Sequence, residues 1–141
     1  MKYESKEKLI EPELSYKLVG ICFKVHSELG CRYQEKYYQR AVEQELIKQK
    51  IQFEKELKVD LLYDNKAIGK YFLDFLVENK IILELKVSKF FHKDDIKQVL
   101  GYLRSKNLEL GILVNFGKDK LEYKRILNSN IRDNSGTISN N

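Results

Sequence analysis

The chain has 141 residues, of which 43% are hydrophobic and 33% are charged, and this balance excludes a disordered or fibrous protein. No apolar run approaches the ~20 residues of a membrane span, and the charged N-terminal segment lacks the apolar core of a signal peptide. We therefore expect one cytoplasmic domain over residues 1–127, without membrane association. The formal net charge of +5 permits an anionic partner such as nucleic acid but does not require one.

Two helices are predicted near the N-terminus. Apolar residues at helical spacing predict the first over residues 12–30, with a proline in its first turn and a glycine at its end. The second is predicted over residues 34–50, and Glu35 points the same way as its apolar face. A carboxylate in that place is either paired or metal-bound, or it is a first-turn residue that the helix dipole favours. The spacing alone leaves both interpretations open.

From Leu57 the hydrophobic period changes to two, which indicates strands. We predict three consecutive antiparallel strands joined by polar turns, with strands at residues 57–61, 68–77 and 81–87 and turns at 64–66 and 78–80.

A third helix begins at residues 92–95. The nearly all-apolar segment 110–116 after it predicts a strand at the sheet centre, and residues 121–125 are expected to form an edge strand. From Asn128 the sequence is polar and aperiodic, so we predict a disordered tail over residues 128–141. The whole order predicts a mixed α/β sheet with helices packed on it.

Cysteine and histidine residues give no sign of a zinc centre. Cys22, Cys31, His26 and His92 lack the tightly spaced ligand pairs that structural zinc sites use. Cys22 lies on the apolar stripe of the first helix, which predicts a buried structural thiol.

The strands around residues 71–87 carry the candidate chemistry. Both apolar rows, 71/73/75/77 and 81/83/85/87, face the core only in one register, with Val77 opposite Ile81, Phe75 opposite Leu83 and Leu73 opposite Leu85. Asp74 then lies opposite Glu84 on the other face, and Lys86 shares that face.

Two carboxylates about 5 Å apart repel each other. A divalent cation such as Mg²⁺ or Mn²⁺ between them would remove this cost. Lys86 would orient or deprotonate a water molecule, or hold a phosphate oxygen. A solvated salt-bridge cluster is the alternative, and the hairpin alone does not decide between the two.

The third helix adds a polar face. Gln98 and Tyr102 are four residues apart, and Lys97 and Arg104 flank them. Such a face could contact a phosphodiester backbone, or it is an ordinary amphipathic boundary.

The sequence resembles the PD-(D/E)XK nuclease superfamily and, within it, the GxxExxY-protein family. The residues that carry this resemblance are, in chain order, Glu35, Asp74, Glu84–Lys86, Gln98 and Tyr102. The stretches that carry the likeness are LGCRYQEKYYQRA, FLDFLVENKIILELKV, QVLGYL and LGILVNFG, and it extends over residues 14–127. Arg32 replaces the leading glycine of the naming motif, and Leu73 stands where the superfamily has its nominal proline.

The resemblance implies a restriction-endonuclease-like core and a Mg²⁺-dependent endodeoxyribonuclease acting in DNA repair, recombination or defence. It implies that Asp74, Glu84 and the backbone carbonyl of Leu85 ligate Mg²⁺ or Mn²⁺. Glu35 would complete the metal site or hold a second ion, and Lys86 would position or activate the attacking water. The remaining implied residues contact substrate: Gln98 would orient a phosphate or a ligand with support from Tyr102, and Lys97 and Arg104 would bind nucleic acid.

Other functions stay open from the sequence. One alternative is a non-catalytic nucleic-acid-binding module of the same fold. Another is a structure-selective Holliday-junction resolvase, which the sequence does not distinguish from a general nuclease. A partner-binding protein is a third reading, since nine tyrosines are compatible with a homodimer surface.

Overall fold

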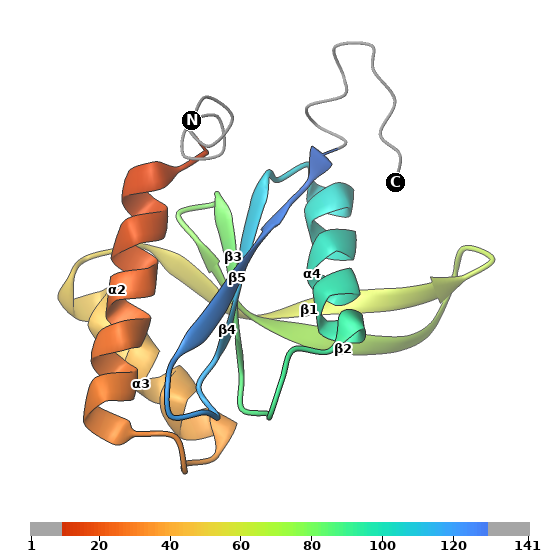
Figure 1. The fold of residues 1–141 in the computed structure, drawn as a ribbon. Coiled ribbons are helices and arrows are strands. Elements are labelled where there is room, and N and C mark those ends of the chain that lie inside the picture. The colour runs from red at the N-terminus through yellow and green to blue at the C-terminus, as the bar shows by residue number, and fades with distance from the viewer. Residues whose placement is uncertain (1–9, 130–141) are drawn as a thin grey trace.

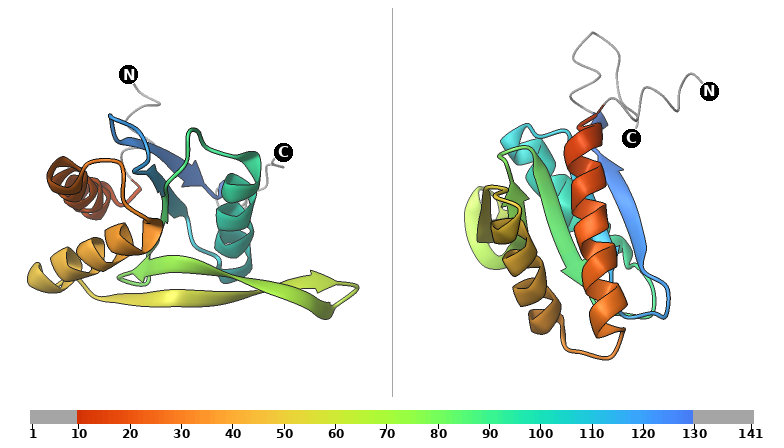
Figure 2. Two further views of the ribbon diagram at one scale, coloured as in Figure 1. Left: turned by 90° about the horizontal axis from the view of Figure 1, so that it is seen from below. Right: turned by 90° about the vertical axis from the view of Figure 1, so that its left-hand side faces the viewer.

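In the computed structural model, which describes residues 10–129, helices cover both faces of a five-stranded sheet (Figures 1 and 2). Helices α2 (Pro12–Leu29) and α3 (Glu35–Lys48) lie on one face, and α4 (Lys93–Lys106) lies on the other. The strands are β1 (Phe53–Tyr63), β2 (Lys66–Val77), β3 (Ile81–Lys86), β4 (Leu110–Asn115) and β5 (Glu122–Leu127). No helix among the described residues is long and apolar enough to cross a membrane.

The strand order is β1-β2-β3-β4-β5, and only the β3–β4 pair is parallel. Helix α4 forms the crossover that a parallel pair requires. This mixed sheet is consistent with a restriction-endonuclease-like fold and confirms the predicted fold class. Every residue of β4 is buried, as its apolar sequence predicts, but β3 and not β4 is the middle strand.

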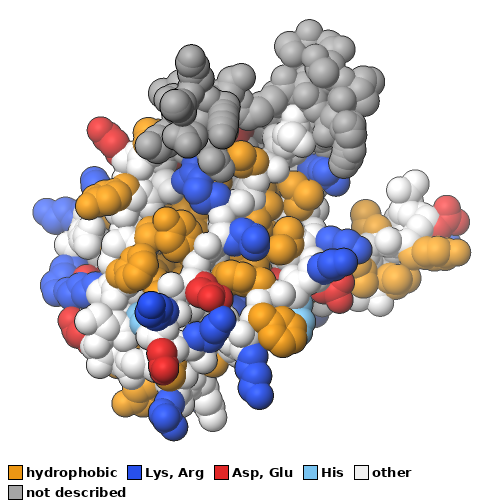
Figure 3. Space-filling model, in the orientation of Figure 1, with side chains coloured by type: hydrophobic (Ala, Val, Ile, Leu, Met, Phe, Trp, Pro, Cys, Tyr) orange, Lys and Arg blue, Asp and Glu red, His pale blue; other side chains and the backbone are white. Residues whose placement is uncertain are grey.

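Both predicted turns are present. Asp64, Asn65, Glu78 and Asn79 all have positive φ angles between 55° and 64°. Asn and Asp tolerate this left-handed backbone better than most residues, and three of these four positions carry them, which is why the sequence marks these turns. The first turn closes a long β1–β2 hairpin that extends beyond the rest of the sheet, with exposed apolar side chains near its end (Figure 3): Leu61, Leu62, Tyr63 and Ile68.

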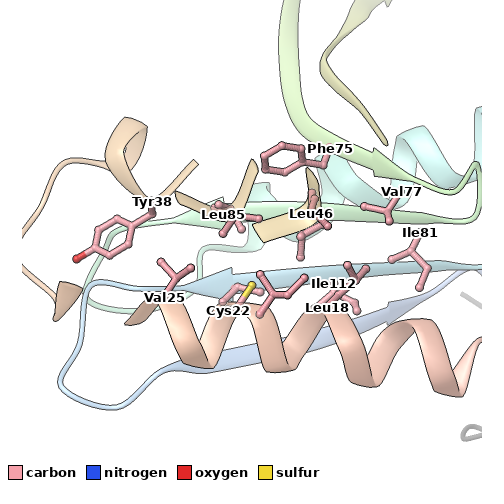
Figure 4. Packing of buried hydrophobic residues seen from close by; sticks show 14 of the residues in the cluster. Leu18, Cys22, Val25, Tyr38, Leu46, Phe75, Val77, Ile81, Leu85 and Ile112 are labelled. Carbon is pink, nitrogen blue, oxygen red and sulfur yellow. The ribbon is translucent and has the colours of Figure 1, made fainter. Parts of the chain in front are cut away.

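The core has one cluster on each face of the sheet. The first lies between the sheet and helices α2 and α3 (Figure 4) and includes Leu18, Cys22, Tyr38, Phe75, Leu85 and Ile112. Cys22 is buried, as predicted, and burial raises the pKa of its thiol to about 12. The second lies under α4 and includes Leu73, Ile82, Val99, Tyr102, Leu103 and Leu113.

Strand β2 exchanges faces at Asp74, so the prediction of one apolar row over residues 71–77 is wrong. Phe75 and Val77 belong to the first cluster, but Leu73 and Tyr71 pack in the second. Between them the β1–β2 ladder lacks the pair formed by Asp74 and Glu56, and Glu56 has a φ of 57°. This local irregularity lets the alternation of side chains change sides.

The end of the domain lies beyond the predicted boundary. Asn128, with which we expect the tail to begin, is only 3% exposed. Its backbone N–H donates to the Glu109 carbonyl at 2.9 Å, and its side chain donates to the Leu108 carbonyl at 3.0 Å. These hydrogen bonds attach Asn128 to the segment between α4 and β4. Residues 130–141 of the predicted tail lie outside the described residues.

Close packing of α4 on β4 depends on Gly111. A Cβ added there would lie 2.5 Å from Cγ1 of Val99, far inside van der Waals contact. We expect Gly111→Ala to lower the free energy of unfolding by about 1–3 kcal/mol, the usual cost of overpacking, as measured by urea denaturation. Gly20→Ala is the matched control, because a Cβ at this helical position meets nothing within 4 Å. It should leave stability unchanged or raise it by up to about 1 kcal/mol. Equal effects of the two changes would contradict this packing account.

Candidate active site

A fork between β2 and β3 holds two acidic side chains. The strands pair only from Phe75–Leu83 to Val77–Ile81, so the predicted register is confirmed there and the predicted Leu73–Leu85 pair is absent. Beyond this point, backbone N–H groups of the two strands donate to side-chain carboxylates in place of the carbonyls of the partner strand. The N–H of Asp74 donates to Oε1 of Glu84 at 2.8 Å, and the N–H of Leu85 donates to Oδ2 of Asp74 at 2.8 Å. The carboxylate of Glu84 is thus held by the backbone of Asp74, and the carboxylate of Asp74 by the backbone of Leu85, the residue after Glu84.

The fork concentrates negative charge away from water. Glu84 is 3% exposed, and burial together with the charge of Asp74 raises its pKa to about 8. Burial also raises the pKa of Asp74, although the N–H of Leu85 acts in the opposite direction. The pKa of Glu35 is raised as well, by burial and by the charge of Asp74. A bound cation would reverse these shifts, because it favours the charged carboxylates.

In the part of the chain that the structure describes, Lys86 is the cation that forms an ion pair with an acid of the fork. Its Nζ lies 3.5 Å from Oε2 of Glu84 and 3.6 Å from Oδ1 of Asp95, which projects from the first turn of α4. Burial lowers the pKa of Lys86, but the charges of Glu84 and Asp95 outweigh burial and hold the pKa above its ordinary value. Lys86 is therefore an ammonium ion at neutral pH.

Helix α3 reaches the fork from the other side. Glu35 is its first residue, and Gln39 lies one turn later on the same face. Nε2 of Gln39 donates to Oδ1 of Asp74 at 2.5 Å and to Oε2 of Glu35 at 3.4 Å. Glu35 therefore fits both interpretations of its position, since it lies in the first helical turn and also borders the site.

The tyrosine of the ExxY spacing has a structural role. Tyr38 is fully buried, its ring stacks on Phe116 with centroids 4.6 Å apart, and its hydroxyl donates to the Gly30 carbonyl. These contacts fix the connection between α2 and α3 and so set the position of Glu35. Arg32, which stands in place of the motif's glycine, does not have a positive φ angle, so the backbone there does not require glycine.

A cleft of about 670 Å³ opens over the fork. Its lining includes Glu35, Gln39, Asp74, Glu84 and Lys86. The acidic donors are all oxygens, which suits a hard cation such as Mg²⁺ or Mn²⁺. Among the described residues, no group of three or more His, Cys, Asp or Glu side chains is gathered as a metal-binding cluster. Mg²⁺ usually keeps several waters and binds through one or two carboxylates, so the Asp74–Glu84 pair fits it.

Other predicted residues lie away from this cleft. Gln98 is half-buried, and its backbone carbonyl accepts a hydrogen bond from the Tyr71 hydroxyl at 3.2 Å. Tyr102 is 7% exposed and packs in the second core cluster. Lys97 and Arg104 are exposed on α4 and do not line the cleft. The structure thus places Glu35, Asp74, Glu84 and Lys86 around one cleft. The four predicted residues of α4 do not line it.

Sequence reasoning missed Gln39 and Asp95. Gln39 was detectable, because it follows Glu35 by four residues and must share its helical face. Asp95 carries no such signal, since its contact with Lys86 depends on how α4 packs against the sheet.

Two acids and a lysine at a strand fork of a mixed five-stranded sheet define a nuclease-like architecture. The family model of the PD-(D/E)XK nuclease superfamily matches residues 12–126, and the chain belongs to this superfamily. No curated protein matches the chain. The crystal structure of SSO0001 is similar to it with a TM-score of 0.49 and 20% identity, covering 89% of this chain and 60% of the other.

Proposed function

We propose that the chain is a divalent-cation-dependent nuclease that hydrolyses DNA phosphodiester bonds. Superfamily membership supports nuclease chemistry in general. The observation that carries the finer proposal is the fork itself, where Asp74 and Glu84 interlock and Nζ of Lys86 lies 3.5 Å from Glu84. Salt bridges of a purely structural kind do not need a pair of buried acids facing an open cleft.

Asp74 and Glu84 would hold the Mg²⁺ or Mn²⁺ ion, with the carbonyl of Leu85 as a further ligand and Glu35 beside them. A divalent cation supplies a water of lowered pKa and neutralises charge on the leaving oxygen. The raised pKa values of the three acids support this assignment, because they mark a site whose charge is not compensated by protein groups alone.

The protein's own groups have distinct parts in this proposal. Lys86, held as an ammonium ion between Glu84 and Asp95, orients the attacking water or a phosphate oxygen. Gln39 fixes the carboxylate of Asp74, and Asp95 positions Lys86. Contact of Gln98 and Tyr102 with substrate, membership of the GxxExxY family, a homodimer and a cytoplasmic role in DNA repair, recombination or defence remain predictions.

The test is cleavage of supercoiled, branched and single-stranded DNA with Mg²⁺ or Mn²⁺. We expect cleavage that EDTA abolishes and that Asp74→Asn lowers by at least about 10³-fold, which corresponds to roughly 4 kcal/mol of transition-state stabilisation. Asp60→Asn is the matched control, because Asp60 is exposed on β1 and its ion pair is with Lys58, outside the cleft. It should cleave like the unaltered chain.

Salt-dependent DNA binding without metal-dependent turnover on any substrate would instead establish a non-catalytic module. Strong preference for a four-way junction would identify a resolvase. Cleavage that survives Asp74→Asn would contradict the assignment of the site.

A further inference from the structure

The cations around the cleft differ in what neutralises them. Lys86 is paired with Glu84 and Asp95, and Nζ of Lys55 lies 3.1 Å from Glu43. Lys36 and Arg40, on α3, also line the cleft, and neither forms an ion pair with any described residue. Their charges are therefore available to an anion that enters the cleft.

Lys36 and Arg40 both contact the ring of Tyr37. They are four residues apart and so neighbours on one side of α3. Nζ of Lys36 lies 5.3 Å and Cζ of Arg40 5.6 Å from the ring centre of Tyr37, which holds both cations without cancelling their charge. They follow Glu35 and Gln39 directly along the helix, so the pair stands beside the residues that reach Asp74.

Helix α4 also carries two lysines four residues apart, Lys93 and Lys97, but none of its basic residues lines the cleft. Lys97 and Arg104 are seven residues apart, and they do not line the cleft. The carboxylates of the cleft repel a phosphate group. Cations beside them are needed to attract the neighbouring phosphates of the strand. Lys36 and Arg40 are the cations in the place where this attraction is needed.

We propose that Lys36 and Arg40 bind the phosphodiester backbone of the substrate strand and set its position over the Asp74–Glu84 fork. This inference deepens the proposed function and rests on it. The recognised chemistry is a run of phosphates, which DNA and RNA share, so the surface fixes position and not sequence.

The experiment measures binding of labelled 30-residue duplex DNA, single-stranded DNA and single-stranded RNA in EDTA, over a range of salt concentrations. For the double variant Lys36→Glu/Arg40→Glu we expect at least a 10-fold loss of affinity for the bound nucleic acids. The slope of log affinity against log salt should fall by about 2 for the duplex, because two phosphate contacts are lost. Comparison of the affinities for the three oligonucleotides tells which nucleic acid supplies the phosphates.

The matched control is Lys120→Glu/Lys124→Glu, which changes the formal net charge of +5 by the same amount at two exposed lysines that are also four residues apart but do not line the cleft. It should alter affinity by less than about 3-fold. An equal loss in both double variants would overturn the proposal, since it would reflect net charge alone. A larger loss in Lys97→Glu/Arg104→Glu, or no nucleic-acid binding by the unaltered chain, would overturn it too.

Cleavage by the unaltered chain separates this inference from the proposed function. Binding that depends on Lys36 and Arg40 without any turnover would retain the inference and remove the nuclease assignment. Metal-dependent cleavage with unchanged binding and rate in Lys36→Glu/Arg40→Glu would retain the nuclease assignment and remove the inference.

Discussion

Lys86→Met is expected to lower metal-dependent cleavage by at least about 10³-fold while the protein stays folded. Methionine keeps most of the volume of lysine but removes the ammonium group. That group lies 3.5 Å from Oε2 of Glu84 and 3.6 Å from Oδ1 of Asp95. Preorganised charge that acts on the reacting groups contributes several kcal/mol in enzymes, so its loss should reduce the rate far more than it reduces stability. Cleavage rates at saturating Mg²⁺, with a melting curve for each variant, measure this.

The protonation state of Lys86 makes the expectation more specific. Without a bound metal ion the carboxylates around Lys86 keep its pKa above the ordinary value, so we expect Lys86 to act as a fixed cation and not as a proton acceptor at neutral pH. Lys86→Arg, which retains the charge, should then recover part of the lost rate. Arg and Met variants with the same low activity would contradict this electrostatic role.

Asp95→Asn provides a second control for Lys86. Asp95 does not line the cleft but ion-pairs with Lys86, so its neutral variant should reduce the rate only about 10-fold, by loosening the lysine. Asp95→Asn should also move the alkaline limb of the pH profile of cleavage to lower pH, because the charge of Asp95 is one of those that raise the pKa of Lys86. A purely structural Asp95 would change stability and leave the pH profile as it is.

The core of this site was predictable because a hairpin has a strict period. Alternation of apolar residues next to the turn sets the pairing of Phe75 with Leu83, and the residues that follow this pair on the two strands, counted from the turn, are Asp74 and Glu84. The short turn at residues 78–80 leaves little freedom to change it. Local rules of this kind also predict the bounds of α2 and the turn residues with positive φ.

What the sequence could not predict depends on tertiary contacts. The ladder ends at Phe75 because the N–H groups of Asp74 and Leu85 bond to carboxylates, an exchange that no periodicity signals. Substrate contact by α4 stays a prediction, because a polar helical face does not tell where the helix docks. Among the residues that the structure describes, the cations that line the cleft without an ion pair are Lys36 and Arg40 on α3, next to the ExxY residues.

Glu84→Gln should have opposite effects on stability and on metal binding. Glutamine keeps a carbonyl oxygen that can accept the hydrogen bond from the Asp74 N–H, but it carries no charge. Without metal we expect the variant to be more stable than the unaltered chain at pH 8, by on the order of 3 kcal/mol, and nearly equal to it at pH 5. Thermal unfolding in EDTA across this pH range measures the difference.

The sign follows from the pKa of Glu84, which folding raises from 4.5 to about 8. The folded protein holds this proton more tightly than the unfolded chain does. The corresponding stability is therefore complete below pH 4.5 and is lost as the pH rises to about 8. Asp74 and Glu35 have raised pKa values too and add a decline of the same sign, which Glu84→Gln should leave in place. Lys86 and Asp95, the other charged groups of the site, are present in both proteins.

Mg²⁺ should reverse the order of stability at pH 8. A cation that binds only the folded state at a hundred times its Kd adds about 2.7 kcal/mol to the unaltered chain. The variant lacks one of the two interlocked carboxylates and should gain much less. Glu109→Gln, the same change at an exposed position, should follow the unaltered chain at every pH, with and without Mg²⁺. If Glu84→Gln were instead less stable than the unaltered chain in EDTA at pH 8, Glu84 would be a structural acid compensated by Lys86, and the fork would have no need of a cation.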